Sequence, residues 1–145
     1  MKLTRKKVIK NQLHKHGKIV KHILVKSLTK PLPVFSHATI YDGIVYVSCL
    51  QGFIPRTFKL AGSKAYQQTE QIMKNLKVIL KESGSNMKKV IKMTIFFKNI
   101  KRDFESVNKI IDAYFPINPP ARSSIEIKDL PKNAKIVIEF CSAVE

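Results

Sequence analysis

Apolar residues recur along the chain with two different spacings, and these spacings predict its helices and strands. Residues 63–83 carry apolar side chains every three or four positions, which predicts an amphipathic helix with Gly84 as its C-terminal cap. A second helix is predicted from Asp103, taken as its N-cap, to the residue before Pro116. The expected buried stripes are Ala65, Thr69, Ile72, Met73, Leu76, Ile79 and Leu80 on the first helix, and Phe104, Val107, Ile111 and Tyr114 on the second.

Short apolar and β-branched runs predict the strands. Asp42-Gly43 is a tight-turn pair between the runs 38–41 and 44–48, so a hairpin is expected there. Residues 49–62 hold two glycines and a proline and are predicted to form a loop. The remaining strands are predicted at residues 19–25, 90–97, 122–127 and 135–143.

This order of elements predicts an α+β fold, in which a mixed sheet of about six strands has two helices packed on one face. Two helices in one layer leave the opposite face of such a sheet without cover. We therefore expect another subunit to bury that face or its edge.

The 145-residue chain is long enough for one domain, and its charge is concentrated near the N-terminus. The formal net charge is +17, and residues 1–30 hold ten Lys or Arg and no acidic residue. Residues 1–18 are predicted to be a disordered basic arm, and residues 19–145 the domain. Because an acid-free arm is also typical of organelle transit segments, a cytoplasmic and a mitochondrial or plastid location both remain open.

The same composition narrows the classes of partner. No segment approaches the roughly 18 uninterrupted apolar residues of a membrane helix, so no membrane partner is expected. A basic surface attracts RNA non-specifically, which does not by itself specify a nucleic-acid function. Cys49 and Cys141 are predicted to be buried free thiols rather than nucleophiles, and no metal-ligand spacing or phosphate loop is present, so no metal or cofactor is expected.

Arg122 and Glu139 are the first candidates for chemistry. Arg122 follows the rigid pair Pro119-Pro120, and Glu139 interrupts an apolar strand, where an unpaired charge is costly. A guanidinium binds carboxylate or phosphate through two parallel hydrogen bonds, and a partly buried glutamate can exchange protons. The alternative is a structural ion pair of Arg122 with Glu126 or Glu139. Asn108, on the second helix, has the same two possibilities, orienting a ligand or capping a loop.

Residues 19–145 resemble the RidA/YjgF family of small enamine/imine deaminases. The resemblance is carried by five segments that span almost the whole domain. They are Phe35-Ser36-His37-Ala38, Val45-Tyr46-Val47-Ser48, Gln68-Thr69 with Asn75-Leu76-Lys77, Asp103-Phe104 with Val107-Asn108, and Pro119-Pro120-Ala121-Arg122-Ser123 with Leu130-Pro131-Lys132 and Ile138-Glu139.

The resemblance implies a chorismate-mutase-like fold, a homotrimer with clefts between subunits, and hydrolysis of reactive 2-enamino and 2-imino acids without a cofactor. It implies that Arg122 binds the substrate carboxylate and that Glu139 orients water and exchanges a proton. Ser124 is implied to contribute a backbone group, while Phe35, Ser48 and Asn108 shape the cleft. Two departures from the family pattern are Phe35 in place of a tyrosine, and Ser48-Cys49-Leu50 in place of Ser-Gly-Gln.

Two other functions compete with the deaminase. Some members of the family are described as endoribonucleases, and for RNA cleavage His37 is the candidate general base in the folded part. A non-catalytic protein that binds a small carboxylate is the other alternative, and the substitutions at Phe35 and Leu50 are consistent with it.

Overall fold

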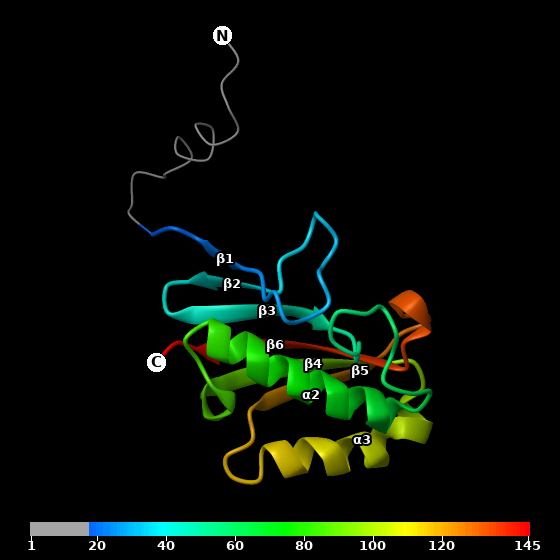
Figure 1. Cartoon of the computed structure of the whole chain (residues 1–145). Coiled ribbons are helices and arrows are strands. Elements are labelled where there is room, and N and C mark those ends of the chain that lie inside the picture. Colours follow the sequence, from blue (N-terminus) through cyan, green and yellow to red (C-terminus); the bar gives the residue numbers. More distant parts are fainter. Residues whose placement is uncertain (1–17) are drawn as a thin grey trace.

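Six strands form one mixed sheet, and two α-helices lie against a single face of it (Figure 1). This arrangement comes from a computed structural model that describes residues 18–145. The predicted arm, apart from Lys18, therefore lies outside the described residues. The strands are β1 (Lys21–Ile23), β2 (Ala38–Tyr41), β3 (Ile44–Leu50), β4 (Val90–Phe97), β5 (Ala121–Glu126) and β6 (Ile136–Ala143). The helices are α2 (Ala65–Glu82) and α3 (Ile100–Tyr114), with short 3₁₀ turns at Met87–Lys89 and Pro131–Asn133.

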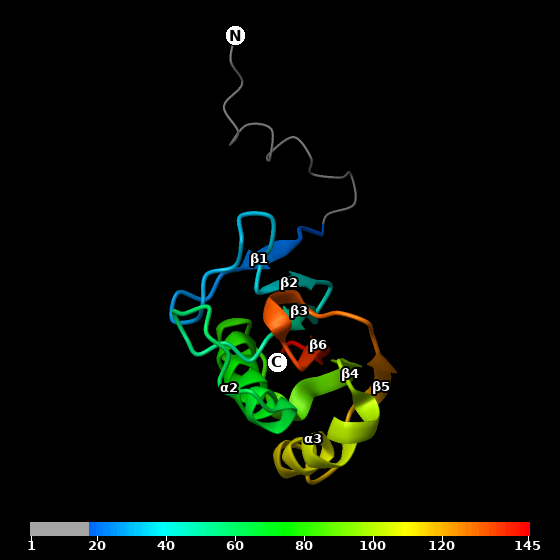
Figure 2. The ribbon, with the colours of Figure 1, turned by 90° about the vertical axis from the view of Figure 1, so that its right-hand side faces the viewer.

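The strand order is β1-β2-β3-β6-β4-β5, which places the last strand of the chain inside the sheet. Only β4 and β5 run parallel, with α3 as the connection between them, and every other neighbouring pair is antiparallel. Figure 2 shows the sheet from its side, with both helices on the same side of it, toward the lower left, and the turn before β6 near the centre. The α+β fold with two helices on one face is confirmed.

The two helices begin and end for identifiable reasons. The backbone N–H of Ser83 closes the last turn of α2, and Gly84 follows with φ of +72°, as expected for a C-terminal glycine. The prediction that Asp103 caps the second helix is wrong. Asn99 caps it, because its side chain accepts a hydrogen bond from the backbone N–H of Arg102. Asp103 lies buried in the first turn and accepts two hydrogen bonds from the Arg102 guanidinium.

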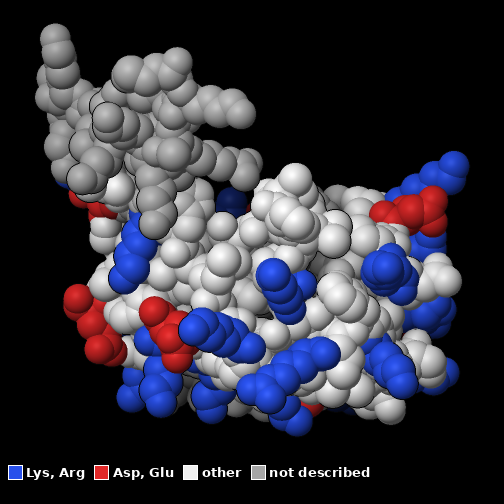
Figure 3. Space-filling model, turned by 45° about the horizontal axis from the view of Figure 1, so that its top comes forward, with Lys and Arg blue, Asp and Glu red and all other residues white. Residues whose placement is uncertain are grey.

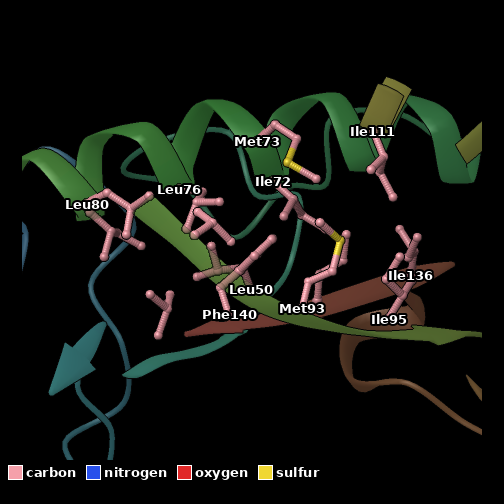
Figure 4. Close-up of a cluster of buried hydrophobic side chains, with 14 of the residues drawn as sticks. Leu50, Ile72, Met73, Leu76, Leu80, Met93, Ile95, Ile111, Ile136 and Phe140 are labelled. Atoms are coloured by element: carbon pink, nitrogen blue, oxygen red, sulfur yellow. The ribbon is translucent and has the colours of Figure 1, made fainter. Parts of the chain in front are cut away.

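The main hydrophobic core fills the space between the helices and the sheet (Figure 4). All seven residues of the predicted stripe of α2 are buried. Each fully buried leucine, isoleucine or methionine side chain contributes about 1.5–3 kcal/mol. The predicted stripe of α3 is only partly buried, because Phe104 is 39% exposed and Tyr114 is half-buried. The side chains drawn and labelled in Figure 4 are Leu50, Ile72, Met73, Leu76, Leu80, Met93, Ile95, Ile111, Ile136 and Phe140.

The side of the sheet away from the helices is called the open face here. Because Ile138 and Phe140 point into the core, the alternate residues Val137, Glu139 and Cys141 point to the open face. Val137 packs there in a small apolar cluster with Leu130 and Ala134 at one end of the sheet. The rest of the open face is more exposed.

The prediction that both cysteines are buried is wrong. Cys49 is exposed and Cys141 is partly exposed. The irregular pairing of β3 with β6 between Val47 and Leu50 explains why Cys49 is exposed. Val47 and Leu50 both point into the core, whereas Ser48 and Cys49 between them do not.

The first predicted strand is shorter than expected, Lys21–Ile23 rather than residues 19–25. In residues 18–145 no helix has the length and apolar content needed to cross a membrane.

Candidate active site

Arg122 lies near the start of β5 and is held by two side chains of α3. Its guanidinium carbon lies 5.6 Å from the ring centroid of Phe104, within the range of a cation–π contact. Its Nη1 donates a hydrogen bond of 2.7 Å to Oδ1 of Asn108. Phe104 and Asn108 are four residues apart and therefore lie on one face of the helix. These three residues are called the arginine group.

The alternative that Arg122 forms a structural ion pair finds no support in the described residues. Among residues 18–145 no carboxylate lies within salt-bridge distance of Arg122. Glu126, one of its two predicted partners, instead accepts a 2.8 Å hydrogen bond from the backbone N–H of Ile100 at the start of α3. A guanidinium has five N–H donors, so most of those on Arg122 stay available to a ligand.

Glu139, the other predicted partner, lies on the opposite face of the sheet. In β4, Met93 is paired with Arg122 and points into the core, whereas the next residue, Thr94, is paired with Glu139. Successive residues of a strand point to opposite faces, so the side chains of Arg122 and Glu139 diverge within one chain. The predicted contact between them is not formed in the protomer.

The remaining predicted site residues divide between these two places. Ser124 is paired with the buried Ile95, which puts it on the same face of β5 as Arg122. Ser48 lies on β3 beside the open face, where its hydroxyl donates to the carbonyl oxygen of Ser36 at 2.6 Å. This hydrogen bond ties β3 to the loop that carries the exposed Phe35. Glu139, Cys49 and Ser48 are called the open-face group.

The electrostatics of the open-face group argue against a thiolate nucleophile. Partial burial of the Cys49 thiol, together with the negative charge of Glu139, raises its pKa from 9.0 to about 11. Burial, and then Glu139, also raise the pKa of Cys141, while Lys92 opposes this shift. Both thiols therefore remain protonated near neutral pH and are poor nucleophiles.

His37 has a structural role in this fold. It is 8% exposed, and its Nδ1 accepts a 2.9 Å hydrogen bond from the backbone N–H of Val25. This acceptor role leaves the proton on Nε2, which lies 3.0 Å from the carbonyl oxygen of Thr29. Both ring nitrogens are thus occupied by backbone, so His37 is not placed to act as the general base proposed for RNA cleavage.

Two surface hollows lie elsewhere, against α2 and α3. Their volumes are about 410 and 380 Å³, they share Tyr66 and Ile110, and neither includes Arg122 or Glu139. The described residues contain no group of three His, Cys, Asp or Glu placed to hold a metal ion. The candidate site therefore consists of the arginine group on one side of the sheet and the open-face group, which contains Glu139, on the other.

The sequence prediction missed the role of Phe104, which it placed in the buried stripe of the second helix. The available signal was the four-residue spacing between Phe104 and Asn108, which brings a ring and an amide to one face of a helix. The position of Arg122 on the strand that follows this helix completes the group.

The protomer is a small α+β protein with an exposed arginine that is supported by the neighbouring helix. Comparison with known proteins identifies the family to which it belongs. The sequence profile described as Endoribonuclease L-PSP matches residues 25–144. The chain belongs to this family, which is also the RidA/YjgF family.

Two relatives and one solved structure illustrate the match. The chain is 42% identical over 105 residues to Reactive Intermediate Deaminase A, chloroplastic, of Arabidopsis thaliana. The aligned region covers 72% of this chain and 56% of that protein. It is 34% identical over 105 residues to the 2-iminobutanoate/2-iminopropanoate deaminase of Homo sapiens. This alignment covers 72% of this chain and 76% of that protein. The crystal structure of the Rid family protein YyfA from Yersinia pestis superposes with a TM-score of 0.82 at 33% identity, over 87% of this chain and 100% of that one.

Proposed function

We propose that the protein hydrolyses reactive 2-enamino and 2-imino acids to 2-keto acids and ammonia. The observation that carries the proposal is the arginine group, in which the Arg122 guanidinium is held by Phe104 and Asn108 and has no carboxylate partner in residues 18–145. Such a group is suited to bind the carboxylate that all these substrates share. The deaminase names of the Arabidopsis and human relatives support the same chemistry.

The proposed reaction makes few demands on the protein. Water adds to the electrophilic C2 of the imine, and the C–N bond then breaks, so the nitrogen leaves as ammonia and C2 becomes a ketone. Arg122 holds the carboxylate, and Glu139 orients the water and exchanges its proton. Ser124 contributes a backbone group, while Phe35, Ser48 and Asn108 shape the cleft. No protein nucleophile takes part, in keeping with the raised pKa values of the thiols.

A homotrimer is part of this proposal. Arg122 and Glu139 point to opposite faces of one sheet, so a cleft that contains both requires a second copy of the chain. The open face supports the same proposal, because Tyr46 lies exposed there opposite Cys141 and has no helix to cover it. Covering that face with another protomer buries the tyrosine and brings new side chains to the sheet edge.

The test is a coupled assay in which a dehydratase generates 2-iminobutanoate and keto-acid formation is followed with and without the protein. Arg122→Ala is expected to lower kcat/KM by about 100-fold or more, because hydrogen bonds to a charged group contribute about 1.5–3 kcal/mol each. Arg122→Lys is expected to retain part of the activity, since an ammonium keeps the charge and loses the two parallel bonds. Arg56→Ala, which removes an exposed arginine on the loop after β3, is the control and is expected to match the wild type.

Wild-type protein that does not accelerate the hydrolysis contradicts the deaminase. If that protein still binds 2-oxobutanoate through Arg122, it is a non-catalytic carboxylate-binding member. The exposed Phe35, which lacks a hydroxyl, and the separation of Arg122 from Glu139 favour this second candidate.

An RNA-acting function has less support. The family description and the charge of +17 favour attraction to RNA, and Figure 3 shows lysines and arginines outnumbering acidic residues on one side of the molecule. Cleavage lacks its candidate base, because both ring nitrogens of His37 are occupied. A salt titration of RNA binding to the full chain and to a chain without residues 1–18 separates the cases. Binding that depends on this segment, with no cleavage, indicates non-specific attraction.

The proposed location is the cytoplasm, or a mitochondrion or plastid if residues 1–18 act as a transit segment. The name of the Arabidopsis relative places that protein in the chloroplast. Imaging of the full chain and of a chain lacking residues 1–18, each tagged at the C-terminus, distinguishes the two locations.

A further inference from the structure

The ring of Phe104 lies under the positive charge of Arg122 and also contacts the core. The ring is 39% exposed, and the guanidinium of Arg122 lies over it at 5.6 Å. Below, the ring packs on Phe97, with centroids 6.1 Å apart and planes inclined by 42°. Phe97 is completely buried. The chain thus builds a stack from the core outward, in which a fixed ring carries an exposed ring and the exposed ring carries a cation.

Asn108 also restrains the guanidinium of Arg122, through a hydrogen bond. Its Oδ1 accepts from Nη1 at 2.7 Å, while the guanidinium carbon lies over the ring of Phe104. A guanidinium that is bonded at one nitrogen and lies over an aromatic ring has less rotational freedom than one in solvent. Within residues 18–145, Nε and Nη2 of Arg122 have no hydrogen-bond partner, so this edge of the guanidinium is open to a ligand.

We propose that Phe104 is a positioning residue that acts through Arg122. Its ring fixes the plane of the guanidinium so that the Nε–Nη2 edge receives the ligand carboxylate through two parallel hydrogen bonds. The ligand class is a small 2-oxo or 2-imino acid, and the identity of this ligand rests on the proposed function. The site needs the ring for orientation rather than for hydrophobic burial, which accounts for a phenylalanine left partly exposed at a helix position predicted to be buried.

The chain offers a matched control for this role. Phe58 also lies under a cation, with Nζ of Lys132 at 5.8 Å from its ring centroid, and it packs edge-on against Phe53. Phe58 is exposed on the loop after β3. Phe58→Leu removes a ring and a cation–π contact of similar geometry, without touching the arginine group.

The experiment measures the dissociation constant of 2-oxobutanoate, a non-reacting product, by calorimetry for the full-length wild type, Phe104→Leu, Phe104→Tyr and Phe58→Leu. Loss of a cation–π contact predicts binding about 3- to 10-fold weaker for Phe104→Leu. Phe104→Tyr keeps the aromatic face and is expected to bind like the wild type, as is Phe58→Leu. The carboxamide analogue 2-oxobutanamide provides the readout of orientation, because Phe104→Leu should lose preference for the acid over the amide.

Equal weakening of acid and amide in Phe104→Leu indicates a packing defect and overturns the proposal. So does an unchanged dissociation constant in Phe104→Leu, or a wild type that does not bind 2-oxobutanoate. In the imine assay Phe104→Leu is expected to raise KM by a similar factor and to change kcat little. If the wild type has no turnover but the binding pattern holds, the deaminase proposal fails and the role of Phe104 stands.

Discussion

The arginine group and the open-face group differ in how complete they are within one protomer. Around Arg122, contacts within the protomer already support the guanidinium, from the buried Phe97 beneath Phe104 to the amide of Asn108. Within residues 18–145, Glu139 has no side-chain hydrogen bond or ion pair, and its charge acts on the neighbouring thiols. In the proposed cleft, one protomer therefore supplies a preorganised arginine group, whereas we expect proton transfer to require a second copy of the chain.

This difference has a simple physical origin. The arginine group lies between a helix and the edge strand β5, where two elements of the same chain supply side chains. The open-face group lies on a bare sheet, where neighbouring strands supply side chains in one layer only.

The largest effect is expected from a charge placed on the open face. Tyr46→Asp should give monomers and abolish imine hydrolysis, because an unpaired carboxylate is costly to bury between protomers. Tyr66→Asp is the control, since Tyr46 is 47% exposed on the open face and Tyr66 is 44% exposed on α2. Light scattering coupled to size exclusion measures the mass of each variant. A Tyr46→Asp protein that keeps the wild-type mass refutes the open face as the interface.

A smaller effect is expected at Glu139. Glu139→Gln should lower kcat at least about tenfold and leave KM nearly unchanged, because a single acid–base group contributes about 10²–10⁴-fold and imine hydrolysis also proceeds unaided. Glu105→Gln, on the exposed side of α3 where it pairs with Lys109, is expected to have no effect. A Glu139→Gln enzyme with wild-type kcat shows that the water is activated by another group. In that case the arginine group would be a binding site, and the open-face group would have only a structural role.

The smallest effect concerns the thiol beside Glu139. With a pKa of about 11 rather than 9.0, Cys49 carries about a hundredfold less thiolate at pH 8 than an ordinary cysteine. Its alkylation by iodoacetamide, followed by mass spectrometry, should therefore rise about tenfold per pH unit without an inflection below pH 10. Glu139→Gln should move the inflection downward by the smaller share of the shift, since burial is the larger cause. An inflection near pH 9 in the native protein contradicts this account, whatever the absolute rate.

The elements with a strong local pattern were predictable from the sequence. The turn at Asp42-Gly43 and the helix that ends before Gly84 are both present, because each depends on residues close together in the chain. The cap of α3 was misassigned because Asn99 and Asp103 are both capping types and stand four residues apart. Only the hydrogen bond from Arg102 to Asn99 distinguishes them.

The site was harder to predict because it depends on the faces of strands. Arg122 was identified from its neighbours in the sequence, yet its relation to Glu139 is set by the pairing of β5 and β6 with β4, which no local pattern reveals. Cys49 was placed in the core because the extra residue between Val47 and Leu50, which reverses the expected alternation, has no clear sequence signal.

The place of β6 in the sheet has a consequence for synthesis. This strand joins β3 to β4, although it is the last of the six strands in sequence order. On the ribosome, the hairpin and both helices emerge before the strand that unites them, so the sheet can close only after β6 has emerged. A nascent chain that still lacks β6 exposes the edges of β3 and β4, which the finished sheet pairs.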